Sequence, residues 1–142
     1  MLNIKYIETE DEYQQARIIR EEVFIREQNV PREIELDEHE DTATHILAVE
    51  DGQTIGTARW RYTEEGVKLE RFAVPEQQRG QGVGIALVEF ALNELREENL
   101  LYLNAQEHVI AFYEKLNFEG VGDIFFEADI PHMKMVYKPK KA

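Results

Sequence analysis

The chain has 142 residues, of which 43% are hydrophobic and 32% are charged, a composition typical of a soluble globular protein. Its length predicts a single domain, residues 1–142, large enough to bury a hydrophobic core. The formal net charge of −13 argues against nucleic acid and anionic membranes as partners. The acidity could favour a cationic amine substrate or simply aid solubility. No cysteine is present, which excludes disulfides, a thiolate nucleophile and cysteine-based metal sites.

The first residues lack the apolar core of a signal peptide, and no apolar run approaches membrane-spanning length. We therefore expect a cytoplasmic protein. Residues 2–7 alternate in hydrophobicity and predict a first strand. Thr9 and Glu12 have the spacing of a capping box, which predicts a helix from Glu10 to about Gln28.

An acidic segment follows from residue 32 to residue 44. A metal site can be imagined there from Asp37, His39, Asp41 and His45, but this spacing fits no familiar ligand set and nothing apolar frames it. We therefore predict a solvated loop without a bound metal. Because loops carry specificity, the segment could also line an acceptor pocket.

Turn signals divide the next part of the chain into strands. Residues 45–50 and 53–63 read as a hairpin around Asp51-Gly52. A turn at residues 64–66 then leads into a strand at residues 68–74. These three strands are expected to form an antiparallel meander.

The strand at residues 68–74 is followed by a glycine-rich loop and a helix from residue 83 to about residue 98. This order favours phosphate binding, because the first N–H groups of a helix lack intrahelical partners and its dipole is positive there. Arg79 adds a positive charge. The loop lacks the ending of a Walker A motif and the spacing of a dinucleotide fingerprint. The alternative is a glycine-rich turn that serves packing alone.

The last third of the chain alternates again between strand and helix. Residues 100–103 predict a buried strand that returns by a right-handed crossover beside residues 68–74. A short helix at residues 108–116 should end before Asn117 in a left-handed conformation. A turn is expected at residues 120–123, followed by strands at 124–127 and 133–137.

Two motifs resemble the GNAT superfamily of N-acetyltransferases. Arg79-x-x-Gly82-x-Gly84 is similar to its acetyl-CoA pyrophosphate loop, and Ala111–Phe118 is similar to its downstream Phe-Tyr-Glu-Lys-x-Gly-Phe segment. Asn117 replaces the usual glycine of that segment, which affects a helix cap rather than the chemistry. Further segments, among them Arg20–Val30 and Glu127–His132, resemble the bacterial YjcF/ElaA-like branch.

The resemblance implies an α/β (α+β) fold, with a mixed, mostly antiparallel sheet of six or seven strands and about four helices. It also implies acetyl-CoA as cosubstrate and no metal. The strand at 100–103 would splay from its neighbour to admit the pantetheine arm. The residues implied in binding acetyl-CoA are Phe72, Ala73, Val74, Arg79, Gly80, Gln81, Gly82, Val83, Gly84 and Asn104.

The same resemblance implies that an amine attacks the acetyl thioester directly. Tyr113 occupies the position that protonates the leaving thiolate; alternatively it packs against the sheet. The base is open between Glu70, whose alternative role is an ion pair with Arg59 or Arg71, and His132, whose alternative role is structural.

Three further residues are implied in contacting the acceptor: Gln28, Gln106 and Glu127. Two other functions remain open: a non-catalytic CoA-binding module acting as sensor or scaffold, and an acyltransferase that uses a longer acyl-CoA. The resemblance leaves the acceptor amine and the choice between monomer and homodimer undetermined.

Overall fold

The computed structural model describes residues 1–139. Seven strands form a mixed sheet in the order β1-β2-β3-β4-β5-β7-β6. The strands are β1 (Leu2–Tyr6), β2 (Thr44–Glu50), β3 (Gln53–Tyr62), β4 (Val67–Ala73), β5 (Leu101–Gln106), β6 (Phe118–Glu127) and β7 (Ile130–Tyr137). The α-helices are α1 (Glu10–Arg20), α2 (Arg32–Glu35), α3 (Val83–Glu94) and α4 (Ile110–Glu114). This architecture confirms the predicted fold class.

The chain divides into two compact units. The N-terminal unit comprises Met1–Arg61 and Arg71–Glu97, and the C-terminal unit comprises Tyr62–Glu70 and the chain from Glu98 onward. Strand β4 contributes residues to both units. None of the helices within residues 1–139 is long and apolar enough to cross a membrane.

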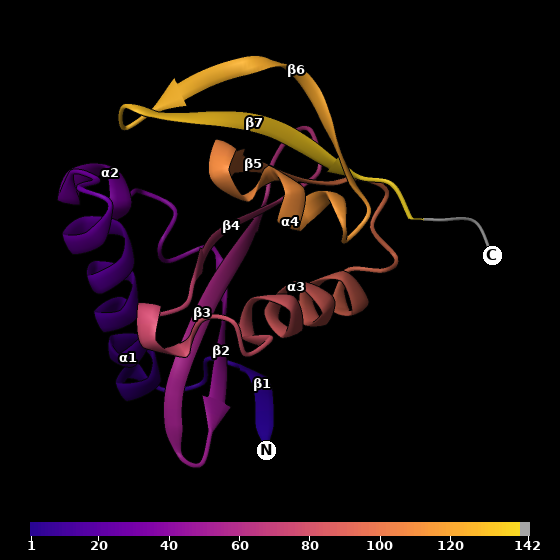
Figure 1. Ribbon diagram of the computed structural model, residues 1–142. Coiled ribbons are helices and arrows are strands. Elements are labelled where there is room, and N and C mark those ends of the chain that lie inside the picture. Colours follow the sequence, from indigo (N-terminus) through magenta and orange to yellow (C-terminus); the bar gives the residue numbers. More distant parts are fainter. Residues whose placement is uncertain (140–142) are drawn as a thin grey trace. The chain divides into compact units, whose positions relative to one another are not determined.

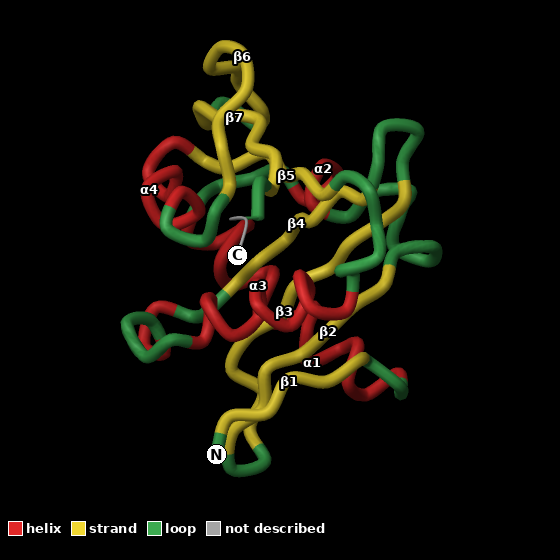
Figure 2. The backbone as a smooth tube through the Cα atoms, turned by 90° about the vertical axis from the view of Figure 1, so that its right-hand side faces the viewer, coloured by secondary structure: helices red, strands yellow, loops and turns green. Residues whose placement is uncertain are grey.

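In the N-terminal unit, α1 and α3 cover opposite faces of the β1–β3 strands (Figures 1 and 2). The close approach of α3 explains a glycine in the middle of β3. A Cβ on Gly56 would come within 2.9 Å of Val83 Cγ1 and 3.1 Å of Leu87 Cδ1. Val83 and Leu87 are both buried, so a larger residue at position 56 would force these side chains to shift within a close-packed core.

The first helix starts as predicted but ends differently. The Thr9 hydroxyl accepts a hydrogen bond from Glu12 N, and the Glu12 carboxylate accepts one from Thr9 N, which confirms the capping box. The predicted helix to Gln28 is α-helical only as far as Arg20, because residues Glu21–Glu27 form a π-helix. A π-helix contains an extra residue per turn, so it changes the direction in which the following side chains point.

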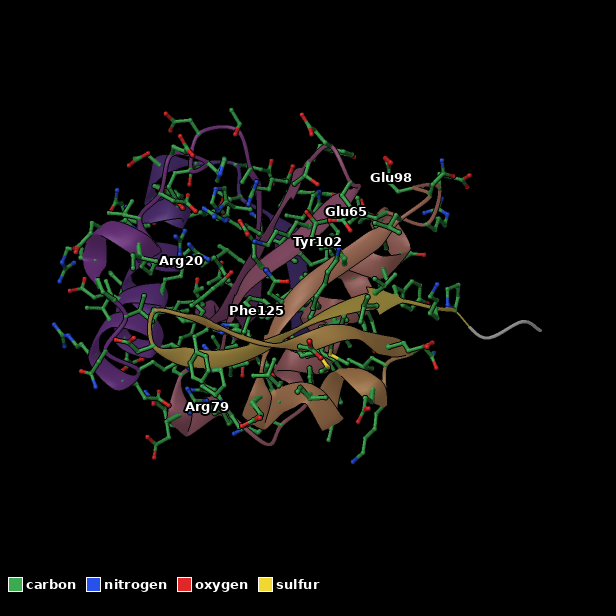
Figure 3. The ribbon with its side chains drawn as sticks, turned by 90° about the horizontal axis from the view of Figure 1, so that it is seen from above. Arg20, Glu65, Arg79, Glu98, Tyr102 and Phe125 are labelled. Carbon is green, nitrogen blue, oxygen red and sulfur yellow. The ribbon has the colours of Figure 1, made fainter. Side chains whose placement is uncertain are left out.

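The prediction of a solvated acidic loop at residues 32–44 is wrong. Residues Arg32–Glu35 form α2, and the side chain of Glu35 is only 2% exposed. Glu35 accepts a hydrogen bond from Arg20 Nε at 2.6 Å, and Arg20 also binds the Glu40 carboxylate with two bonds of 2.8 Å (Figure 3). The acidic segment is ordered against the rest of the unit because buried arginines neutralise its carboxylates.

Arg59 extends this buried ion-pair network. Its guanidinium binds both oxygens of Asp37, at 3.0 and 2.6 Å, and also binds Glu40. Burial would raise the pKa of the Glu40 carboxyl, but hydrogen bonds from Arg20 and Tyr13 and the charges of Arg20 and Arg59 outweigh it and lower the pKa to about 2. The pKa of Asp37 is lowered for a similar reason, since its bonds and charge interaction with Arg59 outweigh its own desolvation.

These lowered pKa values predict acid sensitivity. A carboxyl whose pKa is lower in the folded than in the unfolded state stabilises the fold above its unfolded pKa, and this contribution is lost as the pH falls towards the folded pKa. The difference in unfolding free energy between wild type and Glu40→Gln should therefore be largest near pH 7, at roughly 2 kcal/mol. It should shrink between pH 4.5 and pH 2, the ordinary and the lowered pKa of Glu40.

Urea unfolding across this pH range measures that difference. Glu38→Gln is the matched control, because the Glu38 side chain is 86% exposed in the same segment. Its difference from wild type should stay close to zero at every pH. A wild-type–Glu40→Gln difference that stayed constant down to pH 2 would contradict the assigned ion pairs.

In the C-terminal unit, β6 and β7 form a long hairpin beside β5 (Figure 1). Asn117 has φ +72, so the predicted left-handed helix end is confirmed. The predicted turn at residues 120–123 is wrong. Strand β6 runs through it, with Gly122 at φ +80 and a register shift between Val121 and Phe125. The glycines there mark a β-bulge inside a strand rather than a strand end.

Candidate functional site

The glycine-rich loop between β4 and α3 has the backbone that a phosphate site requires. Gly80 and Gly82 both have positive φ, +80 and +82, and Gly82 is the N-cap of α3. A Cβ at either position would meet no atom within 4 Å. These glycines therefore serve backbone conformation, which argues against the alternative of a turn made for packing alone.

The start of α3 is favourable for an anion. Gly82 provides no side-chain cap, and the first turn of α3 contains no acidic residue. The helix starts directly after the loop, with Gly82 as N-cap, a buried Val83 as first residue and Gly84 in the first turn. The N–H groups of such a turn are not used by the helix itself, and they carry the positive end of its dipole.

Arg79 connects the start of this loop to the π-helix that follows α1 (Figure 3). Its Nε donates to Val74 O at 2.8 Å, which joins the residue after β4 to the loop. Its two terminal nitrogens donate to the two carboxylate oxygens of Glu27, each at 2.8 Å. The arginine predicted to bind phosphate thus forms a bidentate ion pair with a carboxylate of the chain.

Glu27 is the residue at this site that the sequence analysis did not identify. It ends the π-helix Glu21–Glu27 that follows α1, and it lies 52 positions from Arg79. Gln28, predicted to contact the acceptor, is the C-cap of the same π-helix. A periodicity based on the α-helix does not reveal which side chains follow a π-helix, because the extra residue rotates them around the axis.

Replacing Glu27 by glutamine should tighten the binding of an anionic ligand such as acetyl-CoA, the cosubstrate that the resemblance implies. The carboxylate competes with an anionic ligand for Arg79, and its loss also reduces local negative charge. The Arg79 and Glu27 side chains are 40% and 37% exposed, so the dissociation constant should fall by no more than roughly fivefold.

Calorimetric titration at low and high salt measures this effect. Glu21→Gln is the matched control, since Glu21 lies on the same π-helix as Glu27 and forms an exposed ion pair with Arg32 of α2. It should change the affinity much less. Weaker binding by Glu27→Gln would show instead that Glu27 holds Arg79 in its binding orientation.

The C-terminal unit gathers a second set of predicted residues on β5, β7 and β6. Gln106 lies opposite His132 in the β5–β7 register. Asn104 Nδ2 donates to Glu127 Oε1 at 3.4 Å, a long hydrogen bond. The structure thus brings together four residues that the sequence analysis predicted separately.

His132 has a defined orientation within this set. Its Nδ1 lies 2.7 Å from Ile130 O, so this nitrogen is the donor and Nε2 is the accepting nitrogen of the neutral ring. The ring stacks on Phe125, with centroids 5.9 Å apart and planes at 24° (Figure 3). A buried imidazole whose tautomer is set by a backbone carbonyl can accept a proton at Nε2.

Tyr113 lies in α4 and is buried, with ring contacts to Phe112 and Phe118 at 5.0 and 5.7 Å between centroids. Burial raises the pKa of its phenol well above the ordinary value. The hydroxyl therefore stays protonated at neutral pH, as a proton donor must. Glu70, the other base candidate, is also nearly buried, with Lys68 Nζ 3.4 Å from its carboxylate.

Strands β4 and β5 pair in parallel over a short distance. Val67 lies opposite Leu101 and Lys68 opposite Tyr102. Among the described residues of the C-terminal unit, this parallel pairing ends after those two residue pairs, and β5 continues to Gln106 paired with β7. The predicted splaying of these strands stays a prediction.

The residues considered for a metal site have other partners. Asp37 binds Arg59 and Arg71, and His45 Nε2 lies 2.9 Å from Glu40 O. Within residues 1–139, no group of three or more histidine, aspartate or glutamate residues is arranged to hold a metal ion.

Comparisons with known proteins show the family of the chain. The family model described as "Acetyltransferase (GNAT) domain" matches residues 8–139. The chain is 36% identical to the uncharacterized N-acetyltransferase YjcF of Bacillus subtilis, over 89% of this chain and 93% of that protein. Its fold matches the crystal structure of Escherichia coli ElaA with a TM-score of 0.86 and 25% identity, covering 97% of this chain and 100% of that one.

An acyl-CoA N-acyltransferase from Pseudomonas aeruginosa matches with a TM-score of 0.84 and 31% identity, covering 97% of this chain and 99% of that one. These matches extend over most of the chain, and the family model spans the glycine-rich loop and the Tyr113 segment. The chain therefore belongs to the GNAT family of acetyltransferases.

Proposed function

We propose that this protein transfers an acetyl group from acetyl-CoA to a primary amine of a small molecule or peptide. The observation that carries the proposal is the loop from β4 to α3, with left-handed Gly80 and Gly82 and a first helical turn without acidic residues. Such a loop is suited to a pyrophosphate, and the GNAT family uses acetyl-CoA. The net charge of −13 is compatible with a cationic acceptor.

We further propose how the chain holds its cosubstrate. Acetyl-CoA supplies an acyl group activated as a thioester. Backbone amides of residues 79–84 would hold the pyrophosphate. Arg79 would add positive charge once its guanidinium is released from the ion pair with Glu27. Backbone groups of Phe72 and Val74, with Ala73 between them in the chain, would pair with the pantetheine and polarise the carbonyl. Asn104 is also proposed to contact acetyl-CoA. Positioning and electrostatics suit direct attack by an amine.

Proton transfers require an acid and a base. Tyr113 is the proposed general acid, because it matches the position that protonates the leaving thiolate in the resemblance and its phenol is protonated at neutral pH. Glu70 and His132 are the proposed bases; the accepting Nε2 of His132 supports the second. Gln28, Gln106 and Glu127 are proposed to contact the acceptor. We also propose that the whole chain, 1–142, acts as one domain, although residues 140–142 lie outside the described part.

Calorimetric titration with acetyl-CoA, desulfo-CoA and ATP at low salt tests the cofactor assignment. Micromolar binding of acetyl-CoA without comparable ATP binding supports it, and absence of acetyl-CoA binding overturns it. Turnover with a panel of amines can then be followed with a thiol reagent. The chain contains no cysteine, so the only thiol that appears is that of released CoA. Binding without turnover of any amine would favour a non-catalytic CoA-binding module.

A further inference from the structure

Arg71 has an unusual backbone conformation for its place in the fold. Six non-glycine residues in residues 1–139 have a positive φ, and only Arg71, at φ +58, lies inside a strand. The other five lie in turns or at element ends, where this conformation is common. A side chain disfavours it, so it persists only where the surroundings impose it.

The Arg71 side chain is anchored on the acidic segment at residues 32–44. Its Nη2 donates to Ile34 O, Glu35 O and Asp37 Oδ2, each at 3.2 Å, and its Nε donates to Glu35 O at 3.3 Å. These acceptors lie in α2 and the residue pair that follows it. One guanidinium therefore joins the middle of β4 to the acidic segment.

The acceptors are themselves immobilised by the buried ion-pair network. Glu35 is bound by Arg20, and Asp37 is bound by Arg59. The side chains of Arg20, Arg59 and Glu35 are each no more than 2% exposed. The anchor of Arg71 is thus a rigid, charge-compensated cluster rather than a flexible surface loop.

Phe72 and Val74, which follow Arg71, are the residues whose backbone groups are proposed to bind acetyl-CoA. A left-handed residue within a strand makes a local bulge and re-aims the backbone that follows. Two positions further on, Ala73 is buried against Ile19 and Val23 of the first helical segment, with Phe24 beside it. The backbone of Phe72 is therefore constrained from both sides, by the Arg71 guanidinium and by the Ala73 side chain.

We propose that Arg71 is a positioning residue for acetyl transfer: its anchored guanidinium maintains the left-handed turn in β4 and so directs the backbone groups of Phe72 and Val74. This inference rests on the proposed function for the role of those groups. The acidic segment at residues 32–44 thereby fixes the backbone conformation of β4 where acetyl-CoA is proposed to bind.

Two substitutions separate backbone conformation from side-chain contacts. Arg71→Gly removes the guanidinium but can still adopt a positive φ without a Cβ penalty, whereas Arg71→Ala removes the guanidinium and disfavours that φ. We expect Arg71→Ala to lower kcat at least tenfold, and Arg71→Gly to recover at least fivefold of that loss. The KM for acetyl-CoA should change less than kcat. Arg32→Ala, which removes an exposed arginine of α2, is the control and should keep wild-type kcat.

The measurements are made well below the melting temperature of each variant, with the folded fraction checked by circular dichroism. Equal kcat for Arg71→Gly and Arg71→Ala would overturn the proposal, and so would wild-type kcat in both. A second readout does not depend on activity: φ at position 71 in crystal structures of the two variants, expected positive for glycine and negative for alanine. If the wild type failed to bind acetyl-CoA, the proposed function would fall, while these φ values would still decide whether the guanidinium maintains the turn.

Discussion

Replacing Tyr113 by phenylalanine is expected to lower kcat by about 10²- to 10⁴-fold, the usual contribution of a general acid. The dissociation constant for acetyl-CoA should stay within roughly threefold, because positioning of the pyrophosphate is assigned to other residues. The fold should persist, since phenylalanine retains the ring that packs against Phe112 and Phe118. Calorimetry and thiol-release kinetics on the same preparation give both quantities.

The pH dependence sharpens this prediction. Burial raises the pKa of Tyr113, so the protonated, active form persists above the ordinary phenol pKa of 10. Wild-type kcat should therefore show no alkaline fall due to Tyr113 up to at least pH 9. Tyr102→Phe is the matched control, because Tyr102 is also buried and its hydroxyl bonds Thr63 at 2.8 Å. It should retain turnover.

Two results would contradict the acid role. Unchanged kcat in Tyr113→Phe would make Tyr113 a packing residue, as the alternative in the sequence analysis holds. Loss of acetyl-CoA binding would make it a binding residue instead. Retained binding with lost turnover would also eliminate the non-catalytic module, because such a module has no turnover to lose.

The second large effect is expected from Arg20→Ala, which should reduce the free energy of unfolding by about 3–5 kcal/mol. The substitution leaves the carboxylates of Glu35 and Glu40, 2% and 9% exposed, without their main counter-ion. Removing one partner of a buried ion pair is costly because the other charge stays buried. Urea unfolding at pH 7 measures the loss.

Arg26→Ala provides the comparison for this experiment. Arg26 is an exposed arginine on the π-helix that follows Arg20, and its loss should cost less than about 0.5 kcal/mol. The double variant Arg20→Met with Glu35→Leu should lose much less than the two single changes added together, because neither Arg20 nor Glu35 is then left without the other, and Glu40 keeps its ion pair with Arg59. Strict additivity would show that Arg20 and Glu35 do not interact.

Local signals in the sequence determined a large part of this fold. The Thr9–Glu12 capping box, the Asp51-Gly52 hairpin and the left-handed Asn117 were all predicted and are all present. Each feature depends on residues within a few positions of one another, so a short stretch of sequence is enough to predict it. The strand, glycine loop and helix around residues 67–94 were also predicted, because hydrophobic period and glycine spacing are local properties.

Only the tertiary structure decided how charges pair and where strands deform. Arg59 and Asp37 are 22 positions apart and Arg79 and Glu27 are 52 apart, so the sequence suggested a solvated loop and did not reveal the carboxylate that binds Arg79. The positive φ of Arg71 is likewise imposed by contacts with residues 34–37. The physical reason is the same in each case. A buried charged side chain requires a partner of opposite charge or a hydrogen-bond acceptor, and a local sequence pattern does not reveal which distant residue becomes that partner in the fold.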